Sequence, residues 1–294
     1  MTLPTSDTRV TYPAGATDAV ATVVHVETLP DGRAAVLLDS TSCHPVDAGW
    51  PDQGSDRGVL RSANGADIPI RDCVVAATDG RMLYLGAEIP VRKGEDGWAF
   101  VVAHVVDATA AVSLEEGDTI EVRVDPDYRR ALSIGHTACH VASIALNRAV
   151  ADRWTKDARL DALGSPDFDG LAIESSIIHE NGSVDRFRLN KSLRRKGFTT
   201  DGLADELASI RSTVNSVLAQ WHEAGSDIRI DRDGERLTDR RYWACELDGT
   251  AVSIPCGGTH ASSLAALGTV LVKLTIADAD GTPVLTMETT ASPR

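Results

Sequence analysis

Two short segments of the sequence carry side chains that commonly bind metal ions. The first is His136-Thr137-Ala138-Cys139-His140, in which two histidines are four residues apart. If this segment is helical, both imidazoles project from one face and can share a metal ion. The metalloprotease version of this spacing has a Glu after the first histidine, where this chain has Thr137, so a protease is not favoured. Two histidines on a helix surface are the alternative for this segment alone.

The second segment is Pro255-Cys256-Gly257-Gly258-Thr259-His260, in which a Cys and a His are also four residues apart. The glycine pair permits a tight backbone turn between them. Cys256 taken alone could equally be a buried, inert thiol. Thiolate and imidazole are favoured ligands of Zn²⁺. The two segments together therefore predict a zinc site with four ligands: His136, His140, Cys256 and His260.

The first histidine pair lies in a segment with a helical pattern. Apolar residues recur at three- and four-residue spacings from Pro126 to about Trp154, which predicts one long helix. Pro126 suits a first helical turn, and Asp125 is a suitable N-cap. A second helix is predicted between Thr200 and Ala224.

Strand patterns fill most of the remaining sequence. Before residue 125, short apolar runs alternate with turn signals such as Asn64-Gly65, as in an all-β barrel or sandwich. After it, a hairpin turning at Glu180-Asn181-Gly182 and several later strands accompany the two helices. The predicted fold class is α+β, with a β-barrel domain over residues 1–125 and a metal-binding domain with a largely antiparallel sheet over residues 126–294.

Composition limits the class of partner. The 294 residues carry 29 Lys and Arg against 43 Asp and Glu, a net charge of −14, which argues against general polyanion binding. No apolar run reaches the roughly 20 residues of a membrane helix, and the N-terminus does not have the pattern of a signal peptide. We therefore expect a cytoplasmic protein. Its 5 cysteines fit metal binding or catalysis better than a disulfide framework.

The helical histidine pair followed by Cys-Gly-Gly-Thr-His resembles the editing domain of alanyl-tRNA synthetase and its freestanding AlaX-type relatives. Three further segments are also similar to that family: Gly117-Asp118-Thr119-Ile120, Asp125 with Arg129-Arg130, and Gln53-Gly54-Ser55-Asp56-Arg57-Gly58. The resemblance covers almost the whole chain. The remaining length is too short for the adenylation domain of a complete synthetase.

The resemblance implies a metal-dependent deacylase that hydrolyses the ester between an amino acid and a mischarged tRNA. Seryl- or glycyl-tRNA for alanine is the expected substrate. Zinc suits this reaction because it can polarise the ester carbonyl or lower the pKa of a bound water to about 7. Such an enzyme is useful because a synthetase pocket cannot strongly exclude an amino acid that is smaller or merely gains a hydroxyl.

The resemblance also implies catalytic roles for Thr137, Gln53 and Cys256. Thr137 occupies the position assigned to recognition of the substrate hydroxyl, although a helical Thr can equally bond back to a carbonyl one turn earlier. Gln53 is expected to reach the site from its glycine-rich loop, although it could be an ordinary loop residue. Four protein ligands leave zinc no open position, so we expect a labile ligand on the loop of Cys256 and His260.

One segment departs from the family pattern. Relatives place a run of glycines before the Gln, whereas this chain has Asp47-Ala48-Gly49-Trp50-Pro51-Asp52. The loop that shapes the amino-acid pocket is therefore expected to differ. The alternative substrate is a threonine-like or toxic non-protein amino acid carried on another tRNA, of the threonine type.

Positive charge is concentrated in one short segment, which we call the basic segment: Arg186, Arg188, Lys191, Arg194, Arg195 and Lys196. A run of charges can be a solvated face. In a protein that acts on tRNA it is the expected phosphate-binding surface, with Arg240 and Arg241 as a possible second patch.

Two other functions are compatible with the same residues. A zinc-stabilised RNA-binding module without catalysis would bind tRNA without turnover. A metal-dependent hydrolase of small esters would not need the basic segment. The sequence favours charged tRNA as the partner, with neither DNA nor a membrane, and does not indicate an oligomeric state.

Overall fold

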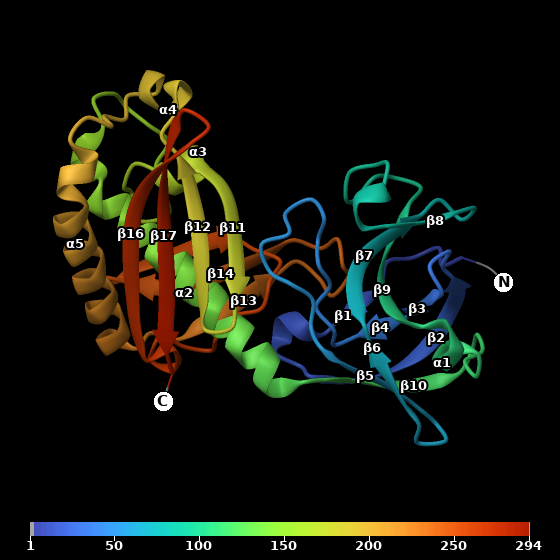
Figure 1. The fold of residues 1–294 in the computed structure, drawn as a ribbon. Helices are drawn as coiled ribbons and strands as arrows, with labels where there is room; N and C mark the ends of the chain where they lie inside the picture. The colour runs from blue at the N-terminus through green and yellow to red at the C-terminus, as the bar shows by residue number, and fades with distance from the viewer. Residues whose placement is uncertain (1–2, 294) are drawn as a thin grey trace. The chain divides into compact units, whose positions relative to one another are not determined.

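A computed structural model describes residues 3–293 of the chain, which form two compact units (Figure 1). The first unit comprises Met1–Arg129, Ile230–Arg241 and Cys256–Thr259. The second comprises Arg130–Arg229, Tyr242–Pro255 and His260–Arg294. After leaving the first unit, the chain therefore returns to it twice. A single domain boundary at residue 125 does not describe these two returns.

The first unit is built on one eight-stranded antiparallel sheet. Its strand order is β6, β5, β10, β2, β3, β9, β7, β8. The strands are β2 (Asp18–Thr28), β3 (Arg33–Leu38), β5 (Gly58–Ser62), β6 (Asp67–Ile70), β7 (Asp72–Thr78), β8 (Leu83–Leu85), β9 (Ala99–Asp107) and β10 (Thr119–Val124). A short parallel pair, β1 (Arg9–Val10) with β4 (Ser40–Thr41), and one turn of helix, α1 (Ala108–Ala111), complete it.

The prediction of a closed β-barrel is not confirmed. The sheet ends at β6 on one side and β8 on the other, and no pairing joins these two strands within residues 3–293. β6 contains Pro69, which has no N–H to donate to a further strand, and β8 has only three residues. Both edges are therefore poorly suited to closure. The apolar alternation that predicted a barrel instead fills a core on this open sheet.

The second unit has the predicted α+β composition. Its two long helices are α2 (Pro126–Ala149) and α5 (Leu203–Ala224). The main sheet is antiparallel with the order β11 (Ile173–His179), β12 (Gly182–Arg188), β17 (Thr282–Ser292), β16 (Thr269–Ala279). Helix α5 lies along β16 (Figure 1), where the Asn215 side chain accepts a 2.8 Å hydrogen bond from the Val272 backbone. The second unit also contains the helices α3 (Phe168–Ala172) and α4 (Lys191–Arg195), most of β14 (Arg241–Leu247) and all of β15 (Thr250–Pro255). The strand β13 (Ile228–Arg232) begins in the second unit, and its residues from Ile230 belong to the first.

Local signals placed the long helices and the hairpin correctly. The Asp125 side chain accepts hydrogen bonds from the backbone N–H groups of Asp127 and Tyr128, both at 3.0 Å, which confirms it as the N-cap of α2. α2 ends at Ala149, five residues before its predicted end. The β11–β12 turn has Asn181 in the left-handed region at φ 59°, which Asn tolerates well. No helix within residues 3–293 is long and apolar enough to cross a membrane.

Helix α3 is attached to α2 by a partly buried carboxyl group. Ser143 donates to the Asp169 carboxylate at 3.0 Å, and burial raises the pKa of Asp169 to about 7. The folded protein therefore keeps a proton that the unfolded chain loses above pH 4. Its contribution to stability is complete below about pH 4 and declines as the pH rises to 7.

Replacing Asp169 with Asn should remove this loss of stability at high pH, because the amide has the same shape and no charge. We expect D169N to raise the free energy of unfolding at pH 8 by about 1–3 kcal/mol and to leave it nearly unchanged at pH 4. Urea denaturation at both pH values measures the difference, with the exposed Asp157→Asn as the control. Equal effects of D169N at both pH values would contradict the assignment.

Candidate metal centre

Helix α2 presents its histidines where a hairpin turn packs directly against the helix. A Cβ atom on Gly135 would lie 2.3 Å from the carbonyl oxygen of His179 and 2.7 Å from that of Gly182, so only glycine fits there. The Asn181 N–H donates to the Ala131 carbonyl oxygen at 2.9 Å. The turn between β11 and β12 is therefore fixed on α2 immediately beside His136.

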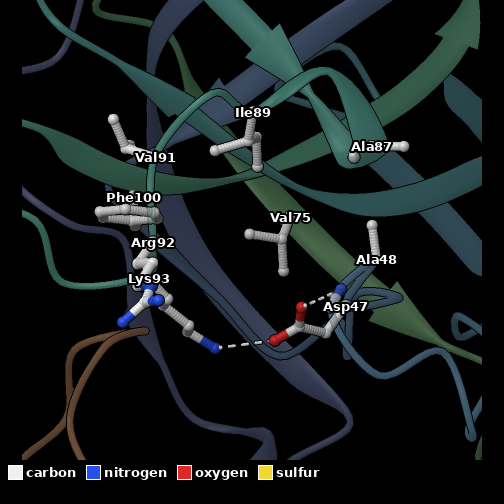
Figure 2. Close-up of a pocket in the computed structure, with 11 residues that line it drawn as sticks. Asp47, Ala48, Val75, Ala87, Ile89, Val91, Arg92, Lys93 and Phe100 are labelled. Carbon is white, nitrogen blue, oxygen red and sulfur yellow. Dashed lines mark hydrogen bonds and ion pairs between the residues drawn. The ribbon is translucent and has the colours of Figure 1, made fainter.

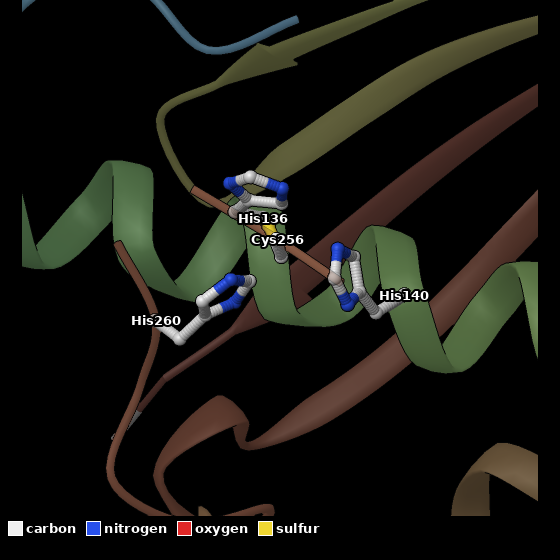
Figure 3. Close-up of side chains that lie close together, drawn as sticks. All are labelled: His136, His140, Cys256 and His260. Atoms are coloured by element: carbon white, nitrogen blue, oxygen red, sulfur yellow. The ribbon is translucent and has the colours of Figure 1, made fainter. Parts of the chain in front are cut away.

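Three imidazole rings converge at this point of the second unit. The ring centroids of His136 and His140 are 4.9 Å apart, as expected for residues four apart on a helix. His260 lies 4.4 Å from His136 and 4.8 Å from His140. Figure 3 shows these rings together with the Cys256 side chain, and the ligand atoms of the four residues all lie within 4.8 Å of one another. The structure therefore brings together the four predicted metal ligands.

The cluster has the properties of an uncharged ligand set. Burial lowers the pKa of His140 to about 4, so its imidazole is neutral at pH 7. The Nδ1 atom of His140 is buried and has no hydrogen-bond partner. Burial raises the pKa of the Cys256 thiol to about 12, so a metal ion must displace its proton to bind the sulfur. A buried, unpartnered imidazole nitrogen beside a thiol and two further imidazoles fits a zinc ion.

Trp243 in β14 covers one side of the histidines and was not identified from the sequence. It is fully buried, and its ring packs edge-on against His140 at 5.3 Å between centroids. An apolar ring in this position excludes water from the histidines and strengthens electrostatic interactions there. The sequence indicates only that Trp243 lies in a strand after the second predicted helix.

The Thr137 hydroxyl lies at the centre of a hydrogen-bond network. It donates to the Ser133 carbonyl oxygen at 2.9 Å, the back-bond expected of a helical threonine. It accepts from the Ala261 N–H at 2.9 Å and lies 3.3 Å from Nδ1 of His260. Because the single hydroxyl proton points to Ser133, we infer that His260 carries its proton on Nδ1. Its Nε2 is then the nitrogen without a proton.

Gln53 contacts the loop of the second motif within the first unit. Its amide nitrogen donates to the Thr259 hydroxyl at 2.9 Å, and its amide oxygen accepts from the Thr259 N–H at 3.0 Å. Gln53 and Thr259 are both buried. Gln53 therefore holds Thr259, one residue before His260, by two hydrogen bonds across 206 positions of sequence.

Asp56 lies on the same loop as Gln53 and binds this loop to the first turn of α2. The Arg129 guanidinium donates to both carboxylate oxygens of Asp56, with Nε to Oδ1 at 2.7 Å. The same guanidinium donates to the Ser42 carbonyl oxygen at 2.7 Å. Both side chains are buried. The ion pair and its hydrogen bonds give Asp56 and Arg129 a structural role. In the sequence, these two residues were identified only by the family resemblance.

A cavity of about 450 Å³ lies in the first unit beside the segment that departs from the family pattern. Figure 2 shows Asp47 at its edge, where the carboxylate accepts from Lys93 Nζ at 3.2 Å and from the Gly49 N–H at 2.9 Å. Its walls combine apolar and cationic side chains: Val75, Ile89, Val91, Phe100 and Arg92. The segment Asp47–Gly49 thus forms part of a cavity wall, with Trp50 exposed next to it.

The basic segment begins in β12 and continues through α4. Arg186 and Arg188 in β12 both face Glu174 of β11, at 3.8 Å and 2.7 Å. Lys191, Arg194, Arg195 and Lys196 are exposed in and just after α4. Lys156 adds a cation to this surface, because its ammonium donates to the Arg195 carbonyl oxygen at 3.1 Å.

The suggestion of a second basic patch at Arg240 and Arg241 is wrong for Arg241. That side chain is buried, and its guanidinium donates to the carbonyl oxygens of Arg236 and Leu237 at 2.5 Å and 3.3 Å. It also lies over the ring of Tyr12. Arg241 is therefore a structural residue of the first unit.

Comparison with known proteins supplies the family context. The alanyl-tRNA editing protein AlaX-M of Pyrococcus horikoshii is 25% identical over 235 residues, which are 80% of this chain and 77% of that protein. The resemblance to alanyl-tRNA editing proteins is confirmed. Alanine–tRNA ligases of Nocardioides sp. and Frankia alni are 25% and 28% identical over 82% and 80% of the chain. The chain spans only 22% of either ligase, and no protein-family model matches it.

The hydrogen bonds of Thr137 predict that it supports metal binding through His260. In T137V the hydroxyl is lost at constant shape, so the His260 ring loses its partner at Nδ1. We expect the zinc affinity of the cluster to fall by about 10- to 100-fold, as for other changes behind a metal-ligating histidine. Competition with a chromophoric chelator measures this affinity.

The matched control is T213V. Thr213 in α5 makes the same back-bond, to the Ser209 carbonyl oxygen at 3.1 Å, on an exposed helix face. Its loss should leave the zinc affinity unchanged. An equal affinity in T137V and the wild type, both folded by circular dichroism, would contradict the role of Thr137.

Proposed function

We propose that this protein is a trans-editing aminoacyl-tRNA deacylase of the cytoplasm that hydrolyses the ester of mischarged tRNA at a zinc site. The observation that carries the proposal is the convergence of three histidines and Cys256 in a chain similar to an alanyl-tRNA editing protein. The protease and small-ester alternatives receive no comparable support. A non-catalytic zinc module remains the alternative to be tested.

The proposed ligands are His136, His140, Cys256 and His260. Three neutral imidazoles and one thiolate form a donor set typical of zinc. A zinc ion in this set supplies Lewis-acid chemistry for attack on an ester carbonyl. Because His260 contacts Thr137 and both helical histidines, we propose that Cys256, which directly precedes the open Gly257, would be the labile ligand.

The other predicted catalytic residues are proposed to act by positioning. Gln53 fixes the loop through Thr259, and Thr137 fixes the ring of His260. The Thr137 hydroxyl has one proton, which is already donated to Ser133. A substrate hydroxyl bound at Thr137 would therefore have to donate to its oxygen or displace one of its present partners.

The proposed substrate is seryl-tRNA for alanine, with glycyl-tRNA for alanine as the second member of this class. The altered segment Asp47–Asp52 supports the runner-up, a threonine-like or non-protein amino acid on another tRNA. Asp47–Gly49 of this segment line the cavity of the first unit, and the segment is followed directly by Gln53. Its effect on specificity is proposed to act through the position of Gln53.

Deacylation of a panel of aminoacyl-tRNAs tests the activity and the metal dependence together. We expect hydrolysis of seryl-tRNA for alanine, little hydrolysis of the alanyl ester, and loss of activity after treatment with a chelator. H136A/H140A should lower kcat/KM by at least about 100-fold, because it removes two ligands of the Lewis acid. His222→Ala, on the other long helix, is the control. Binding of tRNA without turnover of any ester would establish the non-catalytic module instead.

The basic segment is proposed to bind tRNA phosphates. It lies at the end of β12 away from the α2 contact at Gly182, a separation of about 20 Å for a seven-residue strand. Arg186 and Arg188 belong to β12, and Arg194 donates to the Leu189 carbonyl oxygen. The other members of the basic segment are exposed: Lys191, Arg195 and Lys196. Their neutralisation removes phosphate contacts and leaves the metal ligands in place.

We expect K191A/R195A/K196A to raise KM for charged tRNA by about 5- to 20-fold at low salt, with kcat nearly unchanged and a weaker salt dependence. The control is R33A/R61A/R71A, which makes the same change in net charge on exposed, paired arginines. If both triple variants change KM equally, the effect is one of overall charge and the basic segment is not the tRNA site.

A further inference from the structure

A second group of metal-ligating side chains, none of them assigned to the proposed reaction, lies inside the first unit. Cys43, Cys73 and His104 are each fully buried, with 0% exposure. Their sulfur and imidazole nitrogen atoms all lie within 4.8 Å of one another. Free Cys is often fully buried and His less often, but here two thiols and an imidazole gather their ligand atoms in one place, as in a metal site.

The sheet itself creates this proximity. Cys73 in β7 and His104 in β9 are directly opposite each other in the antiparallel register. His104 is also opposite Val36 of β3 on its other side. Cys43 follows the short strand β4, and its N–H donates to the Thr41 hydroxyl oxygen at 3.0 Å. Three rigid backbone segments therefore fix the three side chains before any ion binds.

The hydrogen bonds of His104 fix which of its nitrogens is available. Nδ1 lies 3.1 Å from the Val36 carbonyl oxygen, which can only accept, so the proton of the ring is on Nδ1. Nε2 then carries a lone pair and faces the Thr41 hydroxyl at 2.8 Å. The lone pair of Nε2 accepts a hydrogen bond from the Thr41 hydroxyl, and a backbone carbonyl behind Nδ1 is the usual support of a metal-ligating histidine. The Thr41 hydroxyl can rotate its proton away and offer its oxygen.

The charge and chemical type of the three ligands determine which class of metal ion could bind. Two thiolates, a neutral imidazole and a divalent cation sum to zero, so the complete site can be buried without an uncompensated charge. A monovalent ion would leave one negative charge in the core. Sulfur and imidazole ligands exclude Mg²⁺ and Ca²⁺, which require oxygen. Zn²⁺ and its substitute Co²⁺ meet both conditions.

We propose that Cys43, Cys73 and His104 form a second, structural zinc site in the first unit, with Thr41 as its oxygen neighbour. Because all three ligands are inaccessible to solvent, the ion is acquired during folding and has no access to substrate. The proposal does not depend on the deacylase activity. It predicts a metal stoichiometry of two for the whole protein.

Cobalt substitution tests the site without an activity assay. H136A/H140A/C256S removes the first cluster and its thiol. Refolded from urea with CoCl₂, this variant should bind one equivalent of Co²⁺ and show the near-ultraviolet charge-transfer band of thiolate-bound cobalt. Adding C43A/C73A should abolish both the band and the bound metal. Adding Cys245→Ser, which changes another buried thiol, should leave both unchanged.

Either of two results would overturn the proposal. A folded H136A/H140A/C256S variant that binds no cobalt shows that the three residues are ordinary core side chains. A mass lower by two hydrogens, with a cross-link between Cys43 and Cys73 in the native protein, shows a disulfide instead. Circular dichroism checks folding, and if C43A/C73A variants do not fold, the cobalt band of the parent variant alone decides.

Discussion

The packing of His136, His140 and His260 within 4.9 Å of one another is the constraint on which the rest of the site depends. Two protonated rings at this distance would repel each other, and burial penalises even one charge. Burial keeps His140 neutral at pH 7, so its ring offers a nitrogen lone pair beside the other two imidazoles. This packing is what supports the proposed metal site, because a divalent cation can bind several imidazole nitrogens at once.

Maintaining this packing requires rigid support around it. Gly135 allows the hairpin turn to reach α2, Trp243 closes one side, and Thr137 fixes the His260 ring. Within the first unit, Asp56 is bound to Arg129 in the first turn of α2, and Gln53, three residues earlier, is bound to Thr259. One short loop thus fixes both the beginning of the helix and the residue next to His260. We therefore propose that these residues act by holding the segments that carry the ligands in position.

Local spacing predicted the long helices, the Asp125 cap and the β11–β12 hairpin, whereas most contacts between distant segments could not be predicted from the sequence. The four-residue spacings of His136 with His140 and of Cys256 with His260 follow from the chain itself, as does the Asp125 cap. The pairing of Gln53 with Thr259 spans 206 positions and depends on the complete topology. The burial of Arg241 and the covering role of Trp243 depend on it in the same way. A barrel was predicted because strand patterns are the same in open and closed sheets, and only the edges at Pro69 and β8 distinguish them.

The distribution of charge restricts how this chain could bind RNA. An overall charge of −14 opposes RNA binding, and Glu174 offsets Arg186 and Arg188, whereas four exposed cations lie close together in and just after α4. A phosphate chain attracted there is repelled by most of the remaining surface. Since counterion release scales with the number of phosphate contacts, a small basic surface of this kind would give local rather than extended binding. The proposed deacylase would need this combination, because it would have to release correctly charged tRNAs and yet keep its ligand cluster in place before the ester arrives.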